Sequence, residues 1–261
     1  MLDDFDLTGK RVLITGGGRG IGHGIALAMA EAGADIGVTS LGGDSAVAVA
    51  AEVRALGRQG FGWASDGTRV EAATALRDQA FAALGGVDVL VNCLGDSIRG
   101  SVAALPNSDA PVLDEAGWHK VIDVNLTQAF VGCHVFGPHL LEKGAAASVI
   151  NISSFAALRP GAGMVAYASA KAGLSRFTES LALEWAPFKV RVNAIAPGSF
   201  PDAYVQTPEQ LERRNQTIEG VPLARAGHPR EVGLLAVYLA SGAAAYVTGQ
   251  TYAIDGGRTL T

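Results

Sequence analysis

The sequence predicts one α/β domain, a doubly wound parallel sheet of about seven strands with helices on both faces. Three observations indicate this fold. Short apolar runs alternate with longer segments of helical periodicity along the whole chain, glycine occurs 34 times, and 49% of the 261 residues are hydrophobic. Because no linker or change in composition interrupts the alternation, residues 1–261 are expected to form a single domain.

The expected strands are short runs of β-branched and other apolar residues bounded by turn-forming residues. In chain order they lie at residues 11–15, 35–40, 61–64, 87–92, 148–152, 191–196 and 252–254. Helical segments fill most of the gaps between them, which is the pattern of parallel strands joined by right-handed crossovers.

The expected helices have local signals of their own. Thr68 and Glu71 have the spacing of a capping box at the start of a helix over residues 68–84. Pro229 suits the first turn of a helix over residues 229–239. Further helices are expected at 44–56, around Asn125 to about residue 136, and from Tyr167 to about residue 186.

Composition and charge exclude several classes of function. The net charge is -5 and the pI is about 5.5, so no basic surface is expected to bind nucleic acid or an anionic membrane. No secretory signal and no apolar run of about 18 residues occurs, so a cytoplasmic protein is expected. The five histidines form no HExxH pair or Cys/His cluster, and no metal site is expected.

A glycine turn follows the first expected strand. Residues 15–22 read TGGGRGIG, and Ile21, Ile25 and Met29 then lie four apart on one face of a helix that ends before Gly33. In Rossmann-type folds this unit binds a dinucleotide, because glycine backbone approaches the diphosphate closely and the helix N-terminus offers free amides. The predicted fold is therefore a Rossmann-type three-layer sandwich. The expected cofactor contacts in this turn are Gly16, Gly18, Arg19, Gly20, Ile21 and Gly22.

The end of the second expected strand indicates which dinucleotide binds. An acidic residue there accepts from the ribose 2′-hydroxyl of NAD and repels the 2′-phosphate of NADP. Here the position is Ser40, and Arg19 in the glycine turn is a candidate partner for a phosphate. NADP(H) is therefore favoured. NAD(H) stays open, because Leu41 stands where a second basic residue would have settled the choice and Asp44 lies nearby.

Tyr167 and Lys171 are the candidates for the chemistry. They are four apart, so on a helix they share a face and the ammonium can lie beside the phenol. Bringing a tyrosine pKa from about 10 towards neutrality takes a shift of roughly two units, or about 3 kcal/mol, which an adjacent cation can supply. With five tyrosines in the chain the pair can arise by chance, so its interpretation depends on the other motifs. Ser154 is the third candidate in the same stretch.

With these motifs, the chain resembles the short-chain dehydrogenase/reductase family over nearly its whole length. TGGGRGIG is similar to the family's cofactor loop, NCLG at 92–95 to the turn after its fourth strand, and VNL around Asn125 to its helix asparagine. Ser154 stands 13 positions before Tyr167, the family's spacing, and the segments 192–198 and 246–257 resemble its C-terminal half. The resemblance includes 3-oxoacyl-carrier-protein reductase-like and secondary alcohol dehydrogenase members.

The resemblance implies a catalytic tetrad of Asn125, Ser154, Tyr167 and Lys171. Tyr167 would exchange a proton with the substrate oxygen and Ser154 would place that oxygen. Lys171 would lower the tyrosine pKa and hold the nicotinamide ribose, and Asn125 would anchor a water that relays protons. Further cofactor contacts implied by the resemblance are Asp66, Gly67, Asn92, Gly95, Pro197 and Gly198, besides Tyr167 and Lys171.

The chain departs from the family pattern at three places. One is the segment 96–117, a longer loop than a minimal member carries, which is expected to border the substrate. Cys93 and Leu94 stand where the family has asparagine and alanine, which alters the turn near the adenosine ribose. Asp202 stands where threonine is common, which alters contacts to the nicotinamide amide.

The segment 199–226 mixes apolar residues such as Phe200, Leu211 and Val221 with charged ones, which is typical of a mobile lid over a substrate. A small ketone or secondary alcohol of neutral or moderately apolar character is the expected partner. One alternative is a 3-oxoacyl thioester on an anionic carrier, contacted by Arg99, Arg213 and Arg214. Another is a non-catalytic, NADP-binding regulatory protein on the same fold, because a fold does not determine a function.

The family resemblance also implies a homotetramer or homodimer. The helix that carries Tyr167 has apolar residues at Leu174, Phe177, Leu181 and Trp185, more than one face of a monomer needs. Part of this helix is therefore expected to face a second copy of the chain.

Overall fold

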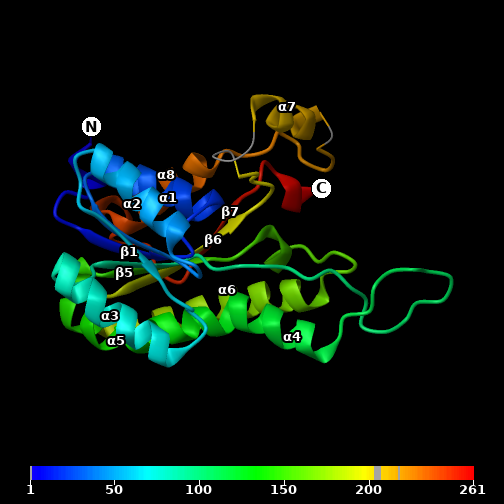
Figure 1. The fold of residues 1–261 in the computed structure, drawn as a ribbon, viewed down its shortest axis with the longest axis horizontal. Helices are drawn as coiled ribbons and strands as arrows, with labels where there is room; N and C mark the ends of the chain where they lie inside the picture. Colours follow the sequence, from blue (N-terminus) through cyan, green and yellow to red (C-terminus); the bar gives the residue numbers. More distant parts are fainter. Residues whose placement is uncertain (1, 203–206, 217) are drawn as a thin grey trace.

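The computed structural model describes residues 2–202, 207–216 and 218–261, in which a central parallel sheet is covered by helices on both faces (Figure 1). The strands are β1 (Arg11–Thr15), β2 (Asp35–Ser40), β3 (Gly60–Ala64), β4 (Val89–Asn92), β5 (Ser148–Ile152), β6 (Arg191–Pro197) and β7 (Thr251–Ile254). They pair in the order β3-β2-β1-β4-β5-β6-β7, and every pairing is parallel. The predicted doubly wound fold is confirmed.

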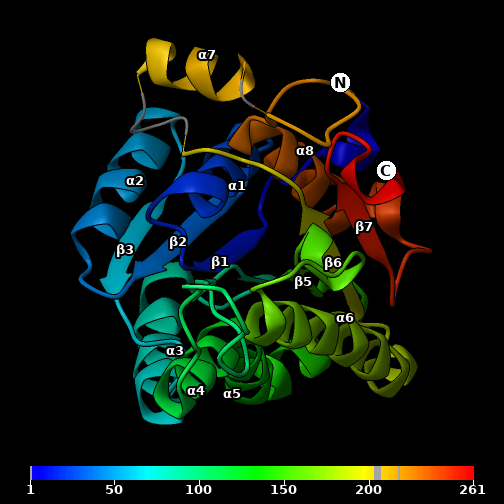
Figure 2. The ribbon, with the colours of Figure 1, turned by 90° about the vertical axis from the view of Figure 1, so that its right-hand side faces the viewer.

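The helices form two layers, which Figure 2 shows on opposite sides of the sheet. They are α1 (Gly20–Glu31), α2 (Asp44–Ala55), α3 (Val70–Leu84), α4 (Glu115–Ile122), α5 (Gln128–Lys143), α6 (Val165–Trp185), α7 (Pro208–Gln216) and α8 (Pro229–Ala240). Helices α1, α2 and α8 cover one face, and α3, α5 and α6 cover the other with α4 beside them.

Each layer has its own apolar core. On one face Ile25 and Met29 of α1 pack with Val232 of α8 against the sheet, and all three are fully buried. On the other face Phe136 of α5 and Trp185 of α6 are buried together. The sheet is thus buried on both sides, which explains why its strands read as continuous apolar runs.

The direction of the connections reverses between β1 and β4. From β1 the chain continues to β2 and β3 on one side, whereas β4 and the later strands lie on the other. Crevices at the carboxyl ends of strands, at such a reversal, are where open α/β sheets bind ligands. The fold therefore directs attention to the segments that follow these strands.

Two sequence expectations about helix starts and interruptions were wrong. Thr68 does not cap α3: α3 begins at Val70, and the Thr68 hydroxyl instead donates to Asp66 Oδ1 at 2.6 Å. The Thr68 hydroxyl group is thus bonded to Asp66 and does not cap the helix. The helix around Asn125 is also longer than expected, and a π-helical turn over Asp123–Thr127 joins α4 to α5.

The longest connections lie near the carboxyl ends of the strands. The loop between β4 and α4 ends one turn earlier than expected, because Asp114 caps α4 by accepting from the Gly117 N–H at 2.7 Å. The expected lid over 199–226 contains α7, and its residues 203–206 and 217 lie outside the described part of the chain. None of the helices among the described residues is long and apolar enough to cross a membrane.

Candidate active site

A cleft of ≈ 970 Å³ lies at the carboxyl ends of five strands. Its walls are the glycine turn after β1, residues 40–45 after β2, residues 93–97 after β4, residues 152–155 at the end of β5, and the segment after β6. Most of the sequence-predicted residues line it: Gly16, Gly18, Arg19, Gly20, Ile21, Gly22, Ser40, Gly95, Ser154, Tyr167, Lys171, Pro197 and Gly198. Asp66, Gly67, Asn92 and Asn125 do not.

The geometry of the glycine turn fits a diphosphate. Gly16 and Gly20 have φ of +72° and +54°, which favour glycine, and a Cβ on Gly22 would lie 2.5 Å from the carbonyl oxygen of Gly16. Among the residues that the structure describes, only the Asp202 carboxyl group approaches the Cβ position of Gly20, at 3.9 Å, so the glycine backbone is accessible from the cleft. Helix α1 begins at this glycine and its first amides lack partners within the helix. These residues fit the diphosphate of a dinucleotide.

The end of β2 presents hydroxyl groups beside this turn. Ser40 accepts from the Gly43 N–H at 3.1 Å through Oγ, and Arg19 is exposed at the rim of the cleft. Ser45, in the first turn of α2, lies so close to Gly18 that a Cβ there would be 2.3 Å from Ser45 Oγ. Sequence reasoning missed Ser45, although its place just after Ser40 could have indicated it.

The candidate catalytic side chains meet across β5 and α6. Ser154 follows β5 and its Oγ accepts from the Ala156 N–H at 3.1 Å, while Tyr167 and Lys171 lie in the first two turns of α6. Lys171 Nζ lies 5.8 Å from the centroid of the Tyr167 ring. Sequence reasoning did not identify Ser153. Its hydroxyl group donates to the Lys171 carbonyl at 3.1 Å and also shares a hydrogen bond with the Ser175 hydroxyl group at 3.0 Å. These bonds fix α6 against the end of β5.

The expected lowering of the Tyr167 pKa is not found. Burial raises this pKa, and a hydrogen bond with Ser154 offsets only part of the effect. Burial also lowers the pKa of Lys171 to about 8. The ammonium is directed at backbone oxygens instead of the phenol: Nζ donates to the Ile152 carbonyl at 2.8 Å and to the Leu94 carbonyl at 3.5 Å. The spacing in the sequence predicted that Tyr167 and Lys171 lie close together, but it could not show that burial removes both side chains from water.

Asn125 lies behind the cleft, in the π-helical turn. Its Nδ2 donates to the Asp96 carbonyl at 2.7 Å and to the Val121 carbonyl at 2.8 Å. Its buried Oδ1 has no partner in the described structure. A Cβ on Gly95 would lie 3.2 Å from this oxygen and 3.3 Å from Lys171 Nζ, so both atoms face the same glycine. The amide oxygen and the ammonium are therefore close enough for one water to bridge them.

The Leu94 side chain separates the adenosine end of the cleft from the turn after β3. A Cβ on Gly16 would lie 2.9 Å from Leu94 Cδ2, and one on Gly67 would lie 2.7 Å from Leu94 Cδ1. Asp66 and Gly67 are thus behind the leucine. The hydrogen bond from Thr68 lowers the pKa of the Asp66 carboxyl group. Burial would raise this pKa, but it offsets only part of that effect.

Asn92 has a structural position. It is fully buried, and its Nδ2 donates to Asn151 Oδ1 at 2.9 Å, while Asn151 Nδ2 donates to Thr178 Oγ1 at 2.9 Å. The three side chains join β4, β5 and α6. Asn92 therefore holds the strand ends against the helix that carries Tyr167, and it does not reach the cleft.

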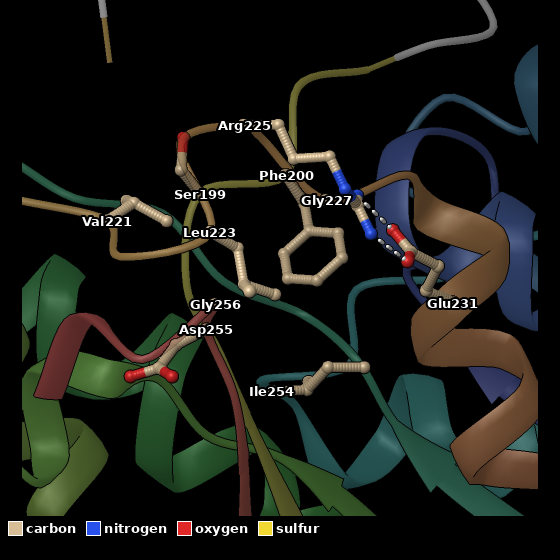
Figure 3. A pocket seen from close by; sticks show the side chains of 10 residues that line it. All are labelled: Ser199, Phe200, Val221, Leu223, Arg225, Gly227, Glu231, Ile254, Asp255 and Gly256. Carbon is tan, nitrogen blue, oxygen red and sulfur yellow. Dashed lines mark hydrogen bonds and ion pairs between the residues drawn. The ribbon is translucent and has the colours of Figure 1, made fainter. Parts of the chain in front are cut away.

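A second, smaller pocket of ≈ 80 Å³ adjoins the cleft at the expected lid, where Phe200 lines both (Figure 3). The Phe200 ring packs so closely on Gly227 that a Cβ there would lie 2.2 Å away. Arg225 closes one side by donating to both carboxylate oxygens of Glu231, at 2.7 and 3.0 Å. This ion pair ties the end of the lid segment to α8.

Two of the arginines considered for a carrier-bound thioester, Arg99 and Arg213, are not among the residues that line the two pockets. Arg99 is exposed, and Arg213 is exposed and pairs with Glu209 one turn earlier at 2.7 Å. The side chain of Arg214 lies outside the described part of the structure. No group of three or more possible metal ligands occurs among the described residues.

Comparison with known proteins gives consistent matches over the whole chain. The family model described as enoyl-(acyl carrier protein) reductase matches residues 16–259. A 3β-hydroxysteroid dehydrogenase of Eggerthella lenta is 37% identical over 98% of this chain and 95% of its own.

Two solved structures are similar to the entire fold. A 7α-hydroxysteroid dehydrogenase, complexed with NADH and 7-oxo glycochenodeoxycholic acid, superposes with a TM-score of 0.85 at 33% identity over 98% of this chain and 96% of its own. Pseudomonas aeruginosa RhlG with NADP in its active site superposes with a TM-score of 0.86 at 32% identity over the full length of both chains.

Proposed function

The chain belongs to the short-chain dehydrogenase/reductase family and is an oxidoreductase of alcohol or ketone groups, and from this premise we propose a mechanism and a substrate class. We propose that it interconverts a ketone and a secondary alcohol, with Tyr167 as general acid in reduction and general base in oxidation. The observation that carries this proposal is the convergence of Ser154, Tyr167 and Lys171 on one cleft that the glycine turn also lines.

The nicotinamide cofactor supplies or accepts the hydride when bound. The chain's own residues bind it and orient it: the bare glycine turn and the amides at the start of α1 take the diphosphate, and Lys171 takes the nicotinamide ribose. Pro197 and Gly198 line the same cleft at the end of β6, and they would border the nicotinamide. Asp202 offers carboxylate oxygens there, which can accept from an amide N–H₂ where threonine would have donated.

Tyr167 holds and moves the proton. Because burial raises its pKa, the phenol is protonated at neutral pH and can donate to the oxygen of a ketone while Ser154 binds the same oxygen. Lys171 stabilises the phenolate that this transfer leaves. Asn125 anchors a water near Gly95 that returns a proton towards Lys171.

We propose NADP(H) as the preferred cofactor. No acid ends β2, and Ser40, Ser45 and Arg19 supply two hydroxyl donors and a cation around the position of a 2′-phosphate. Asp44 also lines this end of the cleft, so binding of NAD(H) is expected to be weaker but measurable.

The segment 199–226 is proposed to be a lid over a neutral or moderately apolar region of the substrate. Phe200 reaches into the cleft from this segment, and Val221 and Leu223 line the adjoining apolar pocket. The relatives that act on hydroxysteroids support a ketone of this character. A 3-oxoacyl thioester is the second candidate, because a relative named 3-oxoacyl-[acyl-carrier-protein] reductase, from Chlamydia pneumoniae, is 33% identical over 98% of this chain and 99% of its own.

A substrate panel tests this proposal. NADPH and NADH absorbance at 340 nm is followed with steroid ketones, aliphatic ketones and 3-oxoacyl thioesters at equal concentration. The proposal expects the highest kcat/KM with a free ketone and NADPH. Exclusive turnover of thioesters would favour the second candidate, and nucleotide binding without turnover of any compound would contradict both.

A further inference from the structure

The last helical turn of the described chain, Arg258–Leu260, packs beside the segment that carries Ser154 (Figure 1). Arg159 Nη1 donates to the Arg258 carbonyl at 2.9 Å and to Thr261 Oγ1 at 3.3 Å. The Arg258 guanidinium carbon lies 4.5 Å from the centroid of the Phe155 ring. Phe155 follows Ser154 directly and lines the cleft with Met164 and Tyr167. The Arg258 guanidinium thus lies against a residue of the cleft wall, although neither Arg258 nor Arg159 lines the cleft itself.

These two cations have no acidic partner. Among the described residues neither Arg159 nor Arg258 forms an ion pair. The carboxylate of Asp255, three residues before Arg258, already accepts the N–H groups of Gly257 at 2.9 Å and Thr259 at 2.8 Å. Arg258 is half-buried, with five N–H donors and no acceptor for them in the described structure. A partly desolvated guanidinium of this kind is a binding group for an anion.

The position of Phe155 sets the distance between that anion and the reacting carbon. Ser154 and Phe155 line the cleft, whereas Arg258 does not line it and contacts its wall through the Phe155 ring. An anion bound by Arg258 would therefore lie beyond Phe155, away from the oxygen that Ser154 is proposed to bind. The cation–π contact uses the face of the Phe155 ring and leaves the N–H groups of the guanidinium available as donors to an anion.

We propose that Arg258, assisted by Arg159, binds a carboxylate of the substrate, so that the protein acts on keto or hydroxy acids whose acid group lies several bonds from the reacting carbon. This inference rests on the proposed function for the reaction itself. It adds a polar terminus to a substrate whose remaining surface is apolar, and it disfavours 2-oxo acids, in which the two groups are adjacent.

A binding experiment tests the site without requiring turnover. Calorimetric titrations of hexanoate and hexanamide, two chains of equal length, are made with the NADP-loaded protein and with the variants Arg258→Gln and Arg77→Gln. Arg77 is a matched control, since it is an arginine on α3 that pairs with Asp78 outside the cleft. Hexanoate is expected to bind wild type and Arg77→Gln at least about 10-fold tighter than hexanamide, and the ratio is expected to fall towards one in Arg258→Gln.

Equal affinities for the two ligands in wild type would overturn the inference, as would an equal loss in both variants. A turnover arm with 5-oxohexanoate and its methyl ester separates this result from the proposed function. If hexanoate binds through Arg258 but neither ketone is reduced, the carboxylate site stands and the proposed reaction fails for this class. If 5-oxohexanoate and its methyl ester are reduced at equal rates and hexanoate binds no tighter than hexanamide, the proposed reaction stands and the carboxylate site is refuted.

Discussion

Arg19 is the residue on which the proposed preference for NADP(H) depends most. It is exposed, and it lines the same cleft as the glycine turn, Ser40 and Ser45. Arg19→Gln should raise the Kd of NADPH by about 10-fold or more and leave the Kd of NADH within about twofold, because only the former has a 2′-phosphate. Fluorescence titration measures both constants. An equal change for the two nucleotides would assign Arg19 to the diphosphate instead.

At the residue scale, the sequence predicted which side chains share the cleft better than it predicted their electrostatics. The spacing of Tyr167 and Lys171 brings both to one wall, as expected for a helix. The direction of the Tyr167 pKa was wrong, because desolvation depends on every surrounding element. Asn92 is likewise a buried link between strands and α6, a position that no local pattern in the sequence could distinguish from a cleft-lining one.

At the scale of elements, Asp88 joins the start of β1 to the end of α5. Its carboxylate accepts from Arg11 Nε at 2.8 Å and from Lys143 Nζ at 2.5 Å. Burial alone would raise its pKa, but these hydrogen bonds lower it to about 2. An acid whose pKa is depressed by folding stabilises the native state above its ordinary pKa near 4, and the stabilisation is lost as pH falls from about 4 to about 2.

Asp88→Asn is therefore expected to lower the free energy of unfolding at pH 7 by about 2 kcal/mol, and urea unfolding measures this. The difference from wild type should shrink as the pH falls from 4 towards 2. Asp78→Asn is the control, because Asp78 is exposed and pairs only with Arg77, so a change within about 0.5 kcal/mol is expected. Equal losses in the two variants would contradict this account.

The Arg225–Glu231 ion pair is the second element-scale feature, because it joins the proposed lid to α8. Glu231 also accepts from the His228 N–H at 2.7 Å as part of a capping box. Hydrogen bonds from Arg225 lower the pKa of Glu231 to about 2, so the pair persists at every pH used for assay.

Glu231→Gln keeps the acceptor for the cap and removes the charge. It should raise KM for the ketone several-fold with little change in kcat or in thermal stability, because it frees the lid without affecting Tyr167. Steady-state kinetics and thermal unfolding test this. A loss of kcat at constant KM would show that the segment does not act as a lid.

Elements with a strong apolar period were predictable, and those without one were not. The strands and most helices lie within a few residues of their expected bounds, because their buried faces impose the pattern. Helix α7 was missed, since PEQLERRNQ is almost entirely polar, and the π-helical turn at Asp123–Thr127 leaves no signature in the residue types.

At the scale of the whole molecule, the surface expected to face a second copy must be reassigned. Leu174, Leu181 and Trp185 are buried within the monomer, and Phe177 packs against the same core. The exposed large apolar residues of α4, α5 and α6 are Trp118, Phe130, Val165 and Leu183. Periodicity identifies apolar faces, but it cannot tell which face packs inside the monomer and which is left for a partner.

The double variant Phe130→Glu/Leu183→Glu is expected to shift the protein from a dimer or tetramer to the 26.7 kDa monomer in sedimentation velocity. In a symmetric contact, the introduced glutamates of one copy would be buried near those of the other copy. The repulsion between these buried like charges should prevent the contact from forming. Leu56→Glu is the control, because Leu56 is 45% exposed and follows α2 in the other layer. A wild-type protein that is already monomeric would refute the proposed assembly.

The most direct test of the central claim, that Tyr167 transfers the proton, is a comparison of Tyr167→Phe with wild type under saturating NADPH. The ring is kept and only the hydroxyl is removed, so the Kd of NADPH should change by less than about twofold. Single-turnover reduction of a ketone, followed at 340 nm, should be about 10²- to 10⁴-fold slower in the variant. A variant that binds NADPH normally and reduces the ketone at the wild-type rate would contradict the account.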